Sequence, residues 1–384
     1  MGEIAMQKNE KGKRYVATMT FHMAHNYGAM LQAYALEQAV NQIGGVSCEI
    51  IDYRFPFIDK WNGIQTFPEL VQKYGIIIGS LKYINRTLRG SYKGIAPLHR
   101  KFNRFMRRNL ILSQKVYYDA EELKTVDYDV ILLRSDQIWN TNLTNGIAEE
   151  YFGKYFDEGK IKLVSYAASC GTDSFSPDLK IRVLPMLKRF AYLGIREKEF
   201  SDFLNKEYNL NTETVLDPVF LLSGKEWKNL FNIKDDKNGE KPYVLVYAFE
   251  CGDEVYQLAR EIASQKGWRI IAIVYNKIEG PYDIEQRTDC GPIDFLALIY
   301  NAQFVCTTSF HGTAFSIIFH RNFYCIGHPL YGQRNRDLLD LLGMSDRMIE
   351  KRGSITKITE CNYTMADERL KSERDKSIQF LKKA

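Results

Sequence analysis

The stretch FVCTTSFHGTAFSIIFHRNFYCIG, residues 304–327, decides the fold of this chain. It opens with an apolar run at 304–306, passes through the polar cluster TTSFHG at 307–312, continues as an apolar helix pattern and closes with a second apolar run at 322–326. This order predicts a strand, a turn, a helix and a second, parallel strand. The backbone N–H groups at the start of such a helix lie at the carboxyl end of a strand, where open α/β sheets bind anionic ligands. His311 lies among hydroxyl groups at that point and could donate or accept a proton; the alternative is a capping turn with a histidine satisfied by its neighbours.

The same alternation of short apolar runs and helix patterns extends over most of the chain. In the first half we expect a helix at 30–43 and strands at 15–19, 47–53, 129–133, 163–167 and 192–195. In the second half we expect strands at 243–247, 269–274, 303–307 and 323–326, and helices at 255–265, 292–301, 313–319 and 337–342. Strands that alternate with helices of this length predict parallel sheets with right-handed crossovers. The predicted fold class is α/β, with two doubly wound (Rossmann-like) domains that face a cleft.

Length and local composition predict the domain boundaries. At 384 residues the chain exceeds the size that one core usually supports. We expect an N-terminal α/β domain over residues 1–222, with a helical insertion at about 55–120, and a C-terminal α/β domain over 223–349. Residues 350–384 are expected to form a tail whose helix packs back on the N-terminal domain.

The charge of the chain limits its partners. A net charge of +5 is small for this length, and a nucleic-acid binder would carry a concentrated basic stripe, so no nucleic-acid partner is expected. One basic stretch occurs at residues 86–108, with aromatic residues spaced as on one face of a helix. A solvated helix that packs on its own core is one explanation of this stretch. The other is peripheral membrane association, through lipid headgroups or a lipid-linked substrate.

Several classes of site and location are disfavoured by what the sequence lacks. The seven cysteines are scattered, with no Cys/His grouping of zinc type, and neither a phosphate-binding P-loop nor a nucleophile elbow occurs. Metal catalysis and ATP hydrolysis are therefore not expected. The polar N-terminal segment 1–15 has no apolar signal-peptide core, and no apolar run is long enough for a membrane span, so we expect a cytoplasmic protein.

Three further polar clusters follow predicted strands of the N-terminal half. The first, HMAHNYG at 22–28, leads into the first helix, and its backbone could receive an anion. The second, SDQIW at 135–139, offers a hydroxyl, a carboxylate, an amide and a flat aromatic face, which suits a sugar; the alternative is a helix cap with a core tryptophan. In the third, SYAASCG at 165–171, small residues would allow a ligand to approach the backbone closely.

Arginines at two places could meet an anionic ligand. Arg196 directly follows a predicted strand and could bind a carboxylate or phosphate with two hydrogen bonds; the alternative is an ion pair with Glu197 or Glu199. Arg334 and Arg336 follow the last predicted strand. They could complete an anion pocket or cap the next helix.

Taken together, these segments resemble the polysaccharide pyruvyl transferase family. The matching segments, in chain order, are TFHMAHNYGAMLQAYAL with the following IIDY, SDQIW, SYAASCG, IREKEF, VLDPVFLL, TTSFHGTAFSIIF and RNRDLLDLLGMSDRMI, from about residue 15 to residue 349. The resemblance implies a two-domain fold like that of GT-B glycosyltransferases. It also implies a phosphoenolpyruvate donor on the C-terminal side of the cleft and a sugar acceptor on the N-terminal side.

The reaction that the resemblance implies places a pyruvate ketal on two sugar hydroxyls and releases phosphate, in cell-surface polysaccharide biosynthesis. No cofactor or metal is expected, because phosphoenolpyruvate is a co-substrate; the acceptor is a saccharide or a lipid-linked oligosaccharide. His311 would protonate the methylene carbon, and Arg196 would meet the negative charge of the donor. The expected donor-binding residues are Thr308, Ser309, Gly312, Thr313, Arg334 and Arg336. The expected acceptor-binding residues are His25, Asn26, Tyr27, Ser135, Asp136, Gln137, Trp139 and Ser169.

Two positions depart from the family pattern. Some members carry an arginine two residues before the histidine, where this chain has Ser309. One donor contact would then be missing, or Arg334 or Arg336 would supply it. The residue before SDQ is commonly glycine in relatives and is Arg134 here, which either adds a charge for the substrate or blocks an approach. A GT-B glycosyltransferase that uses a nucleotide-sugar and a catalytically inactive glycan-binding relative are the alternative functions.

Overall fold

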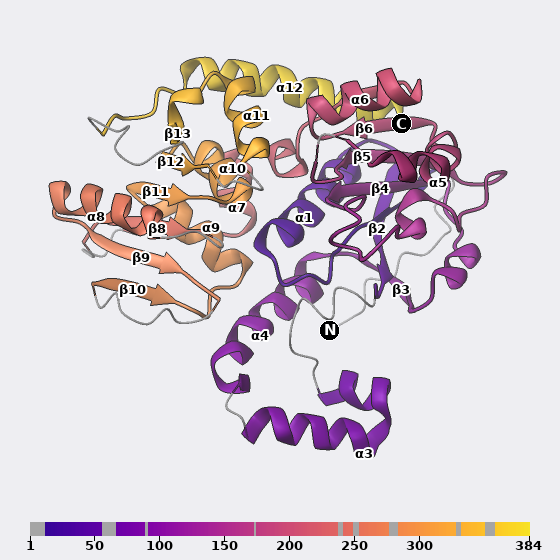
Figure 1. The fold of residues 1–384 in the computed structure, drawn as a ribbon, viewed down its shortest axis with the longest axis horizontal. Helices are drawn as coiled ribbons and strands as arrows, with labels where there is room; N and C mark the ends of the chain where they lie inside the picture. Colours follow the sequence, from indigo (N-terminus) through magenta and orange to yellow (C-terminus); the bar gives the residue numbers. More distant parts are fainter. Residues whose placement is uncertain are drawn as a thin grey trace. The chain divides into compact units, whose positions relative to one another are not determined.

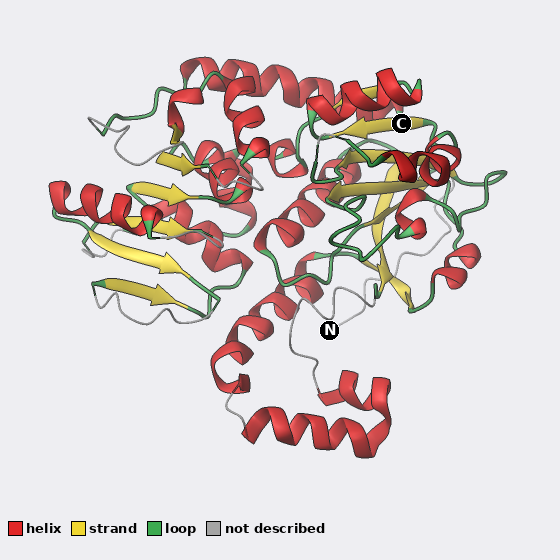
Figure 2. Ribbon diagram, in the orientation of Figure 1, coloured by secondary structure: helices red, strands yellow, loops and turns green. Residues whose placement is uncertain are grey.

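A computed structural model of the chain describes residues 12–55, 67–88, 91–172, 174–236, 241–248, 253–275, 283–327, 332–349 and 358–384. The chain divides into two compact units. Unit 1 contains Met1–Trp61, Met106–Leu222 and Lys371–Ala384, and unit 2 contains Asn62–Phe105 and Ser223–Leu370. Each unit is built around one parallel sheet (Figures 1 and 2).

The sheet of unit 1 has seven strands. They are β1 (Arg14–Met19), β2 (Val46–Tyr53), β3 (Leu112–Tyr117), β4 (Val130–Asp136), β5 (Lys162–Ala168), β6 (Tyr192–Ile195) and β7 (Thr212–Thr214). Their order is β3-β2-β1-β4-β5-β6-β7, and every neighbouring pair is parallel. The order reverses between β1 and β4, and this switch point is where open α/β sheets bind ligands.

The helices of unit 1 connect these strands and cover the sheet. They are α1 (Tyr27–Asn41), α5 (Pro177–Leu187), α6 (Lys198–Tyr208), the C-terminal part of α12 (Thr364–Lys383) and the 3₁₀ helices η1 (Ala120–Thr125), η2 (Glu149–Phe152) and η3 (Pro218–Leu221). Leu36 and Val40 of α1 share a buried cluster with Val16 of β1 and Val130 of β4. Phe380 of α12 joins the same cluster. The end of the chain therefore forms part of the core of unit 1.

The sheet of unit 2 has six strands. They are β8 (Tyr243–Tyr247), β9 (Arg269–Ile273), β10 (Ile284–Arg287), β11 (Phe304–Thr307), β12 (Asn322–Ile326) and β13 (Met348–Ile349). Their order is β10-β9-β8-β11-β12-β13, again with parallel neighbours throughout. The reversal here lies between β8 and β11, so the strand that precedes His311 forms one side of the switch point.

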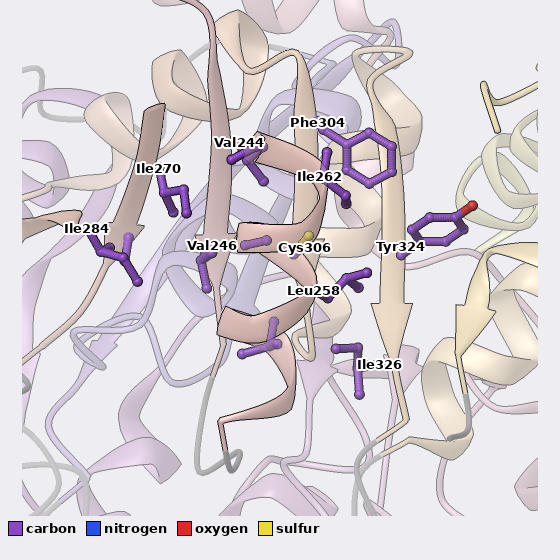
Figure 3. Close-up of a cluster of buried hydrophobic side chains, with 14 of the residues drawn as sticks. Val244, Val246, Leu258, Ile262, Ile270, Ile284, Phe304, Cys306, Tyr324 and Ile326 are labelled. Carbon is purple, nitrogen blue, oxygen red and sulfur yellow. The ribbon is translucent and has the colours of Figure 1, made fainter. Parts of the chain in front are cut away.

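The helices of unit 2 are α7 (Gly224–Leu230), α8 (Glu254–Lys266), α9 (Pro292–Asn301), α10 (Phe310–Ile318), α11 (Gln333–Leu342), the start of α12 and the 3₁₀ helix η4 (Ser345–Arg347). Helix α8 packs on one face of the sheet. Its Leu258 and Ile262 lie over Val244 and Val246 of β8 and Cys306 of β11 (Figure 3). The strands of this face are apolar because they are covered by a helix, as parallel sheets require.

Two further helices, α3 (Phe67–Leu88) and α4 (Ser91–Asn109), precede β3 in the chain. The backbone of α3 leaves the helical conformation at Gly75 (φ 77°, ψ 166°), so α3 consists of two helical segments (Figure 1). Lys101 of α4 pairs with Asp289 (3.1 Å) and Asp294 (2.9 Å). These ion pairs attach α4 to the start of α9 within unit 2.

The two parallel, doubly wound sheets confirm the predicted α/β class. Four strands were not predicted, namely β3, β7, β10 and β13. Of these, β3 lies in the segment expected to be a helical insertion, and that expectation is wrong for residues 112–117. The facing arrangement of the two domains around a cleft stays a prediction.

Candidate functional site

The turn between β11 and α10 lies at the switch point of unit 2, and hydrogen bonds hold it in place. Thr307 Oγ1 donates to the carbonyl oxygen of Tyr247 (2.5 Å), which ties the end of β11 to the end of β8. The backbone N–H of Ser309 donates to Thr307 Oγ1 (3.0 Å). Ser309 is the N-cap of α10, and its Oγ accepts from the backbone N–H of Gly312 (3.4 Å). The hydroxyl residues of this turn therefore determine where the helix begins.

His311 lies in the first turn of α10 and is partly exposed. Its ring meets the ring of Phe310 edge to face, at 5.2 Å between centroids. The guanidinium carbon of Arg334 lies 5.9 Å from the centroid of the same Phe310 ring. Phe310 thus brings a histidine and an arginine, which are distant in the sequence, to one helix N-terminus. The partial positive charge of a helix N-terminus adds to the charge of Arg334, so the place favours an anion.

Helix α11 is joined to this turn by a residue that the sequence analysis did not identify. Asn335 is fully buried, and its Nδ2 donates to the carbonyl oxygen of Thr308 (3.2 Å). This bond positions Arg334, the preceding residue, beside the turn. Arg336 is half-buried on the same helix. The only sequence signal for Asn335 was its place between the two arginines.

Gly312 and Thr313, both expected to bind the donor, are buried beneath the turn. A Cβ atom at Gly312 would lie 2.3 Å from Thr307 Oγ1, so glycine is needed for α10 to approach β11. Thr313 is fully buried, and its Oγ1 donates to the carbonyl oxygen of Ser309 (3.2 Å). These two residues support the turn, and their expected contact with the donor, through the N-terminus of α10, stays a prediction. Thr308 and Ser309 are nearly buried, at 7% and 8% exposure.

The switch point of unit 1 is built in a similar way. Thr20, directly after β1, donates from its Oγ1 to the carbonyl oxygen of Ser135 in β4 (3.1 Å). Asn26 is exposed and caps α1 by accepting from the backbone N–H of Ala29 (3.1 Å). His25 is half-buried beside this cap, whereas Tyr27 is buried in the first turn of α1. Asn26 and His25 are therefore the residues of this loop that a ligand can reach.

The backbone is strained where β4 and β5 end. Asp136 (φ 76°) and Ala167 (φ 51°) adopt the left-handed conformation that residues other than glycine rarely occupy. Such outliers cluster at functional sites. Gly171 also has a positive φ, and a Cβ on it would lie 2.5 Å from Oε1 of Gln137. The segments SDQIW and SYAASCG are therefore in direct contact, and the backbone N–H of Trp139 also donates to the carbonyl oxygen of Ser169 (3.1 Å).

The tryptophan of SDQIW does not form a sugar platform. Trp139 is 1% exposed, stacks on Phe152 at 5.4 Å between ring centroids, and donates from Nε1 to the carbonyl oxygen of Tyr151 (2.9 Å). The alternative of a core tryptophan is the correct one. Ser135 is also fully buried, whereas Asp136 is partly exposed and its Oδ1 accepts from the backbone N–H of Gln137 (2.9 Å).

Arg196 lies in a buried group of charged side chains. Its Nε pairs with Glu197 Oε1 (2.9 Å), and its Nη1 pairs with Asp217 Oδ2 (3.2 Å). Ser169 is also buried and donates from Oγ to Glu197 Oε1 (2.8 Å). Burial lowers the pKa of Arg196, but the carboxylates of Glu197, Asp217 and Asp136 raise that pKa above its ordinary value. The sequence analysis considered the pair with Glu197 and missed Asp217, whose only signal was an Asp-Pro step.

Arg134 does not face a ligand. It is fully buried below α1, and its Nη1 donates to the carbonyl oxygens of Gln32 (3.1 Å) and Ala33 (2.8 Å). Burial lowers the pKa of Arg134 to about 10 and raises the pKa of the nearby Glu37 to about 7. The expectation that Arg134 adds a charge for the substrate is wrong, because α1 encloses its guanidinium.

His22 was noted only as part of a two-histidine loop, and it is a buried structural residue. Its Nε2 lies 3.0 Å from Asp52 Oδ1, and Arg54 Nε lies 2.6 Å from the same oxygen. Its Nδ1 lies 3.3 Å from the carbonyl oxygen of Thr20. His22 therefore links the loop after β1 to the end of β2, next to the switch point.

Across the residues that the structure describes, no three His, Cys, Asp or Glu side chains come together as a potential metal site. None of the helices in the described segments is long and apolar enough to cross a bilayer.

The sequence model of a family described as polysaccharide pyruvyl transferase matches residues 26–329. No curated protein matches the sequence. Among solved structures, the chain is similar to a UDP-N-acetylglucosamine 2-epimerase from Rickettsia bellii, with a TM-score of 0.51 and 12% identity, over 97% of this chain and 95% of that one. It is also similar to UDP-GlcNAc 2-epimerase from Neisseria meningitidis bound to UDP-GlcNAc, with a TM-score of 0.50 and 8% identity, over 96% and 93% of the two chains.

At these identities the likeness shows the fold alone. The fold is a two-domain, Rossmann-like architecture of the GT-B kind, as predicted from the sequence.

Proposed function

The chain belongs to the polysaccharide pyruvyl transferase family, and from this membership we propose that it transfers the enolpyruvyl group of phosphoenolpyruvate to a sugar as a pyruvate ketal. The acceptor class is a saccharide of a cell-surface polysaccharide or its lipid-linked precursor. The observation that carries the proposal is the turn at the start of α10. There, His311 and Arg334 flank one aromatic ring at a helix N-terminus, at the switch point of unit 2.

The proposed reaction balances without any further reactant. The oxygen atoms of two sugar hydroxyls form bonds to C2 of phosphoenolpyruvate, and the bond from C2 to the phosphate oxygen breaks. One proton is delivered to the methylene carbon, which becomes a methyl group. The two sugar hydroxyls lose one proton each. One of these protons restores the proton donor of the enzyme, and the other protonates the departing phosphate. The enzyme therefore needs a proton donor for the methylene carbon and fixed positive charge for the carboxylate and the phosphate.

Unit 2 offers groups suited to the donor. His311 is the partly exposed titratable side chain of the turn and would protonate the methylene carbon. The N-terminus of α10 and the guanidinium of Arg334 would hold the anionic groups of the donor. Arg336 is half-buried on the same helix and would be a further cation for the donor.

Unit 1 offers groups suited to sugar hydroxyls. Asp136, held in a strained conformation at the end of β4, would accept a hydrogen bond from an acceptor hydroxyl. Asn26 and His25 lie at the other strand of the same switch point and would add polar contacts. Arg196 is engaged with Glu197 and Asp217, so we propose that it acts through these carboxylates as a positioning residue for the Asp136 turn.

Calorimetric titration with phosphoenolpyruvate, followed by turnover assays, tests the proposal. We expect phosphoenolpyruvate to bind, and phosphate to be released when a panel of methyl hexopyranosides is added. The sugar product should gain the mass of pyruvate less one water. His311→Gln should abolish phosphate release and leave donor binding nearly unchanged, because the histidine acts on the proton and not on the charge of the donor.

Two arginine variants test whether donor binding depends on Arg334 itself or on the overall positive charge of the protein. Arg334→Ala should weaken phosphoenolpyruvate binding by about tenfold or more, as loss of a charge-assisted hydrogen bond does. Arg182→Ala, at a side chain 59% exposed in unit 1, should have no effect. Binding of UDP-GlcNAc without binding of phosphoenolpyruvate would favour a nucleotide-sugar enzyme instead. Binding of sugars alone would favour a glycan-binding protein.

A further inference from the structure

Helix α3 carries a group of exposed apolar side chains, here called the α3 patch. Its members are Ile76 (70% exposed), Ile77 (74%), Ile78 (53%), Leu81 (62%) and Ile84 (51%). Scattered apolar residues on a surface need no explanation, but five large exposed ones within nine residues of one helix are a local concentration that does. Such a patch in a folded chain marks an interaction surface.

The spacing of the patch follows the helix. Ile77, Leu81 and Ile84 are related by steps of four and three residues, so they share one face of the segment after Gly75. Lys82 lies at the edge of that face, and its Nζ lies 3.4 Å from the centroid of the Tyr74 ring. The segment therefore has an apolar face bordered by a cation, which is the pattern of a helix that lies in a membrane interface.

Nearly all charged residues in the segment around the α3 patch are basic. Residues 67–109, which include α3 and α4, contain ten lysines and arginines and a single acidic residue, Glu69. Their formal charge is +9, and because the whole chain carries +5, the remaining residues carry −4. Among the side chains of α4 that the structure describes, the exposed cations are Arg100, Arg104, Arg107 and Arg108. The positive charge of the protein is thus concentrated on the segment that also carries its apolar patch.

We propose that the α3 patch enters the headgroup region of an anionic lipid bilayer, while the basic residues of α3 and α4 contact the lipid headgroups. Helix α3 would lie in the interface and would not cross the membrane, in keeping with the absence of a membrane-spanning helix among the described residues. The other candidate occupant is a second copy of this chain. It would bring two segments of charge +9 together, whereas an anionic bilayer complements that charge. This surface is independent of the proposed reaction.

Vesicle flotation of the full chain tests the proposal. The probes are vesicles of phosphatidylcholine alone and of phosphatidylcholine mixed with an equal amount of phosphatidylglycerol. We expect the chain to float with the mixed vesicles and not with the neutral ones, and to be released as salt is raised. The double variant Ile77→Glu/Leu81→Glu should bind the mixed vesicles about tenfold less or weaker still. The control Ile181→Glu, at a side chain 82% exposed on α5, should bind like the unaltered chain.

A second variant separates the contribution of charge from that of the apolar patch. Arg100→Glu/Arg104→Glu should also weaken flotation, while Lys206→Glu, at a side chain 84% exposed on α6, should not. All six substitutions in these four variants are at exposed positions, so melting temperatures should stay close to that of the unaltered chain. The proposal is overturned if the chain floats with neither vesicle or if Ile77→Glu/Leu81→Glu floats normally. It is equally overturned if the chain is a dimer in solution that this double variant dissociates, since the patch would then bind a second copy.

Discussion

At the scale of single residues, hydroxyl groups fix the two strand ends at each switch point. Thr20 bonds to the carbonyl oxygen of Ser135 in unit 1, and Thr307 bonds to that of Tyr247 in unit 2. Each bond joins the two strands between which the chain reverses direction across the sheet. The loops that follow these strands are therefore anchored, and polar side chains on them keep a defined position, as a binding site requires.

Gly312 is the residue on which the turn of unit 2 depends most closely. Alanine in a helix is ordinarily favoured over glycine by about 1 kcal/mol. Here its Cβ would lie 2.3 Å from Thr307 Oγ1, which is itself held by two hydrogen bonds. Overpacking of this kind costs about 1–3 kcal/mol and exceeds the helix gain. We therefore expect Gly312→Ala to lower the free energy of unfolding in urea, and to reduce turnover by moving His311.

Gly44 is the control for that substitution. No atom lies within 4 Å of a Cβ built on it, and the residue is exposed. Gly44→Ala should change the free energy of unfolding by less than about 0.5 kcal/mol. If Gly312→Ala proves as stable as Gly44→Ala, then α10 can move away from β11 and the packing argument fails.

Substitution of Arg196 distinguishes a structural role of this residue from a direct role in donor binding. Its side chain is 5% exposed and neutralises Glu197 and Asp217, which are 6% and 1% exposed. Removing one partner from a buried ion pair costs about 3–5 kcal/mol, because the remaining charge stays buried. Arg196→Ala should therefore lower the free energy of unfolding by about that amount, as measured by chemical denaturation. Arg260→Ala, which breaks the exposed pair with Asp283, should change stability little. Normal stability with lost donor binding would instead return Arg196 to the donor site.

At the scale of elements, helix α1 meets the sheet through two buried charged residues, Glu37 of the helix itself and Arg134 of β4. Both are fully buried, and Glu37 accepts a hydrogen bond from the backbone N–H of Ile111 (2.9 Å). Burial raises the pKa of Glu37 from 4.5 to about 7, although that hydrogen bond and the charge of Arg134 act in the opposite direction. A carboxyl group enclosed in this way prefers its protonated form.

The stability of the protein should therefore depend on pH through Glu37. Between pH 4.5 and 7 the folded state holds the proton of Glu37 and the unfolded state has released it, so stability falls as pH rises through this window. Glu37→Gln removes this contribution. Its stability relative to the unaltered chain should rise by about 3 kcal/mol between pH 4 and pH 8, measured by urea denaturation across pH.

The exposed Glu368→Gln on α12 is the control for this pH dependence. Its stability relative to the unaltered chain should stay constant between pH 4 and pH 8. A difference curve for Glu37→Gln that is equally flat would mean that Glu37 is not enclosed as described.

Strands that are buried on both faces were predictable from sequence, and edge strands were not. The strands at the switch points, such as β4 and β11, are continuous apolar runs because helices cover both faces of the sheet. By contrast, β10 reads IEQR and β3 reads LSQKVY, with polar residues on the uncovered side. Such segments lack the periodicity that identifies a strand.

The start of helix α1 was predicted three residues late. The cap at Asn26 determines where this helix begins, and the apolar pattern does not.

The candidate site was predictable as a set of segments but not as a set of side-chain roles. Residue types that bind a ligand also cap helices and fill cores, and only tertiary burial separates these uses. Trp139 and Thr313 have suitable chemistry and proved to be buried. Asn335 and Asp217 have ordinary sequence surroundings and proved to hold the turns in place.

At the scale of the whole molecule, the described residues form a buried core within each of the two units. The core of unit 1 includes Phe380 of the C-terminal helix, next to Tyr166 and Tyr192 at 6.1 and 6.3 Å between ring centroids. The core of unit 2 includes Phe304 of β11, next to Tyr324 at 5.3 Å. Units with their own cores can in principle unfold separately, and the last segment of the chain is required for the first unit.

Reciprocal core variants test this independence by native-state hydrogen exchange. Replacing a buried phenylalanine by alanine costs about 3–5 kcal/mol through lost burial and a residual cavity. We expect Phe380→Ala to reduce the protection of amides in β5 and β6 by about that amount and to leave those in β8 and β11 unchanged. Phe304→Ala should give the opposite pattern, so each variant is the control for the other. Equal loss of protection in both sheets from either substitution would mean that the chain unfolds as one cooperative body, in which the two cores stabilise each other.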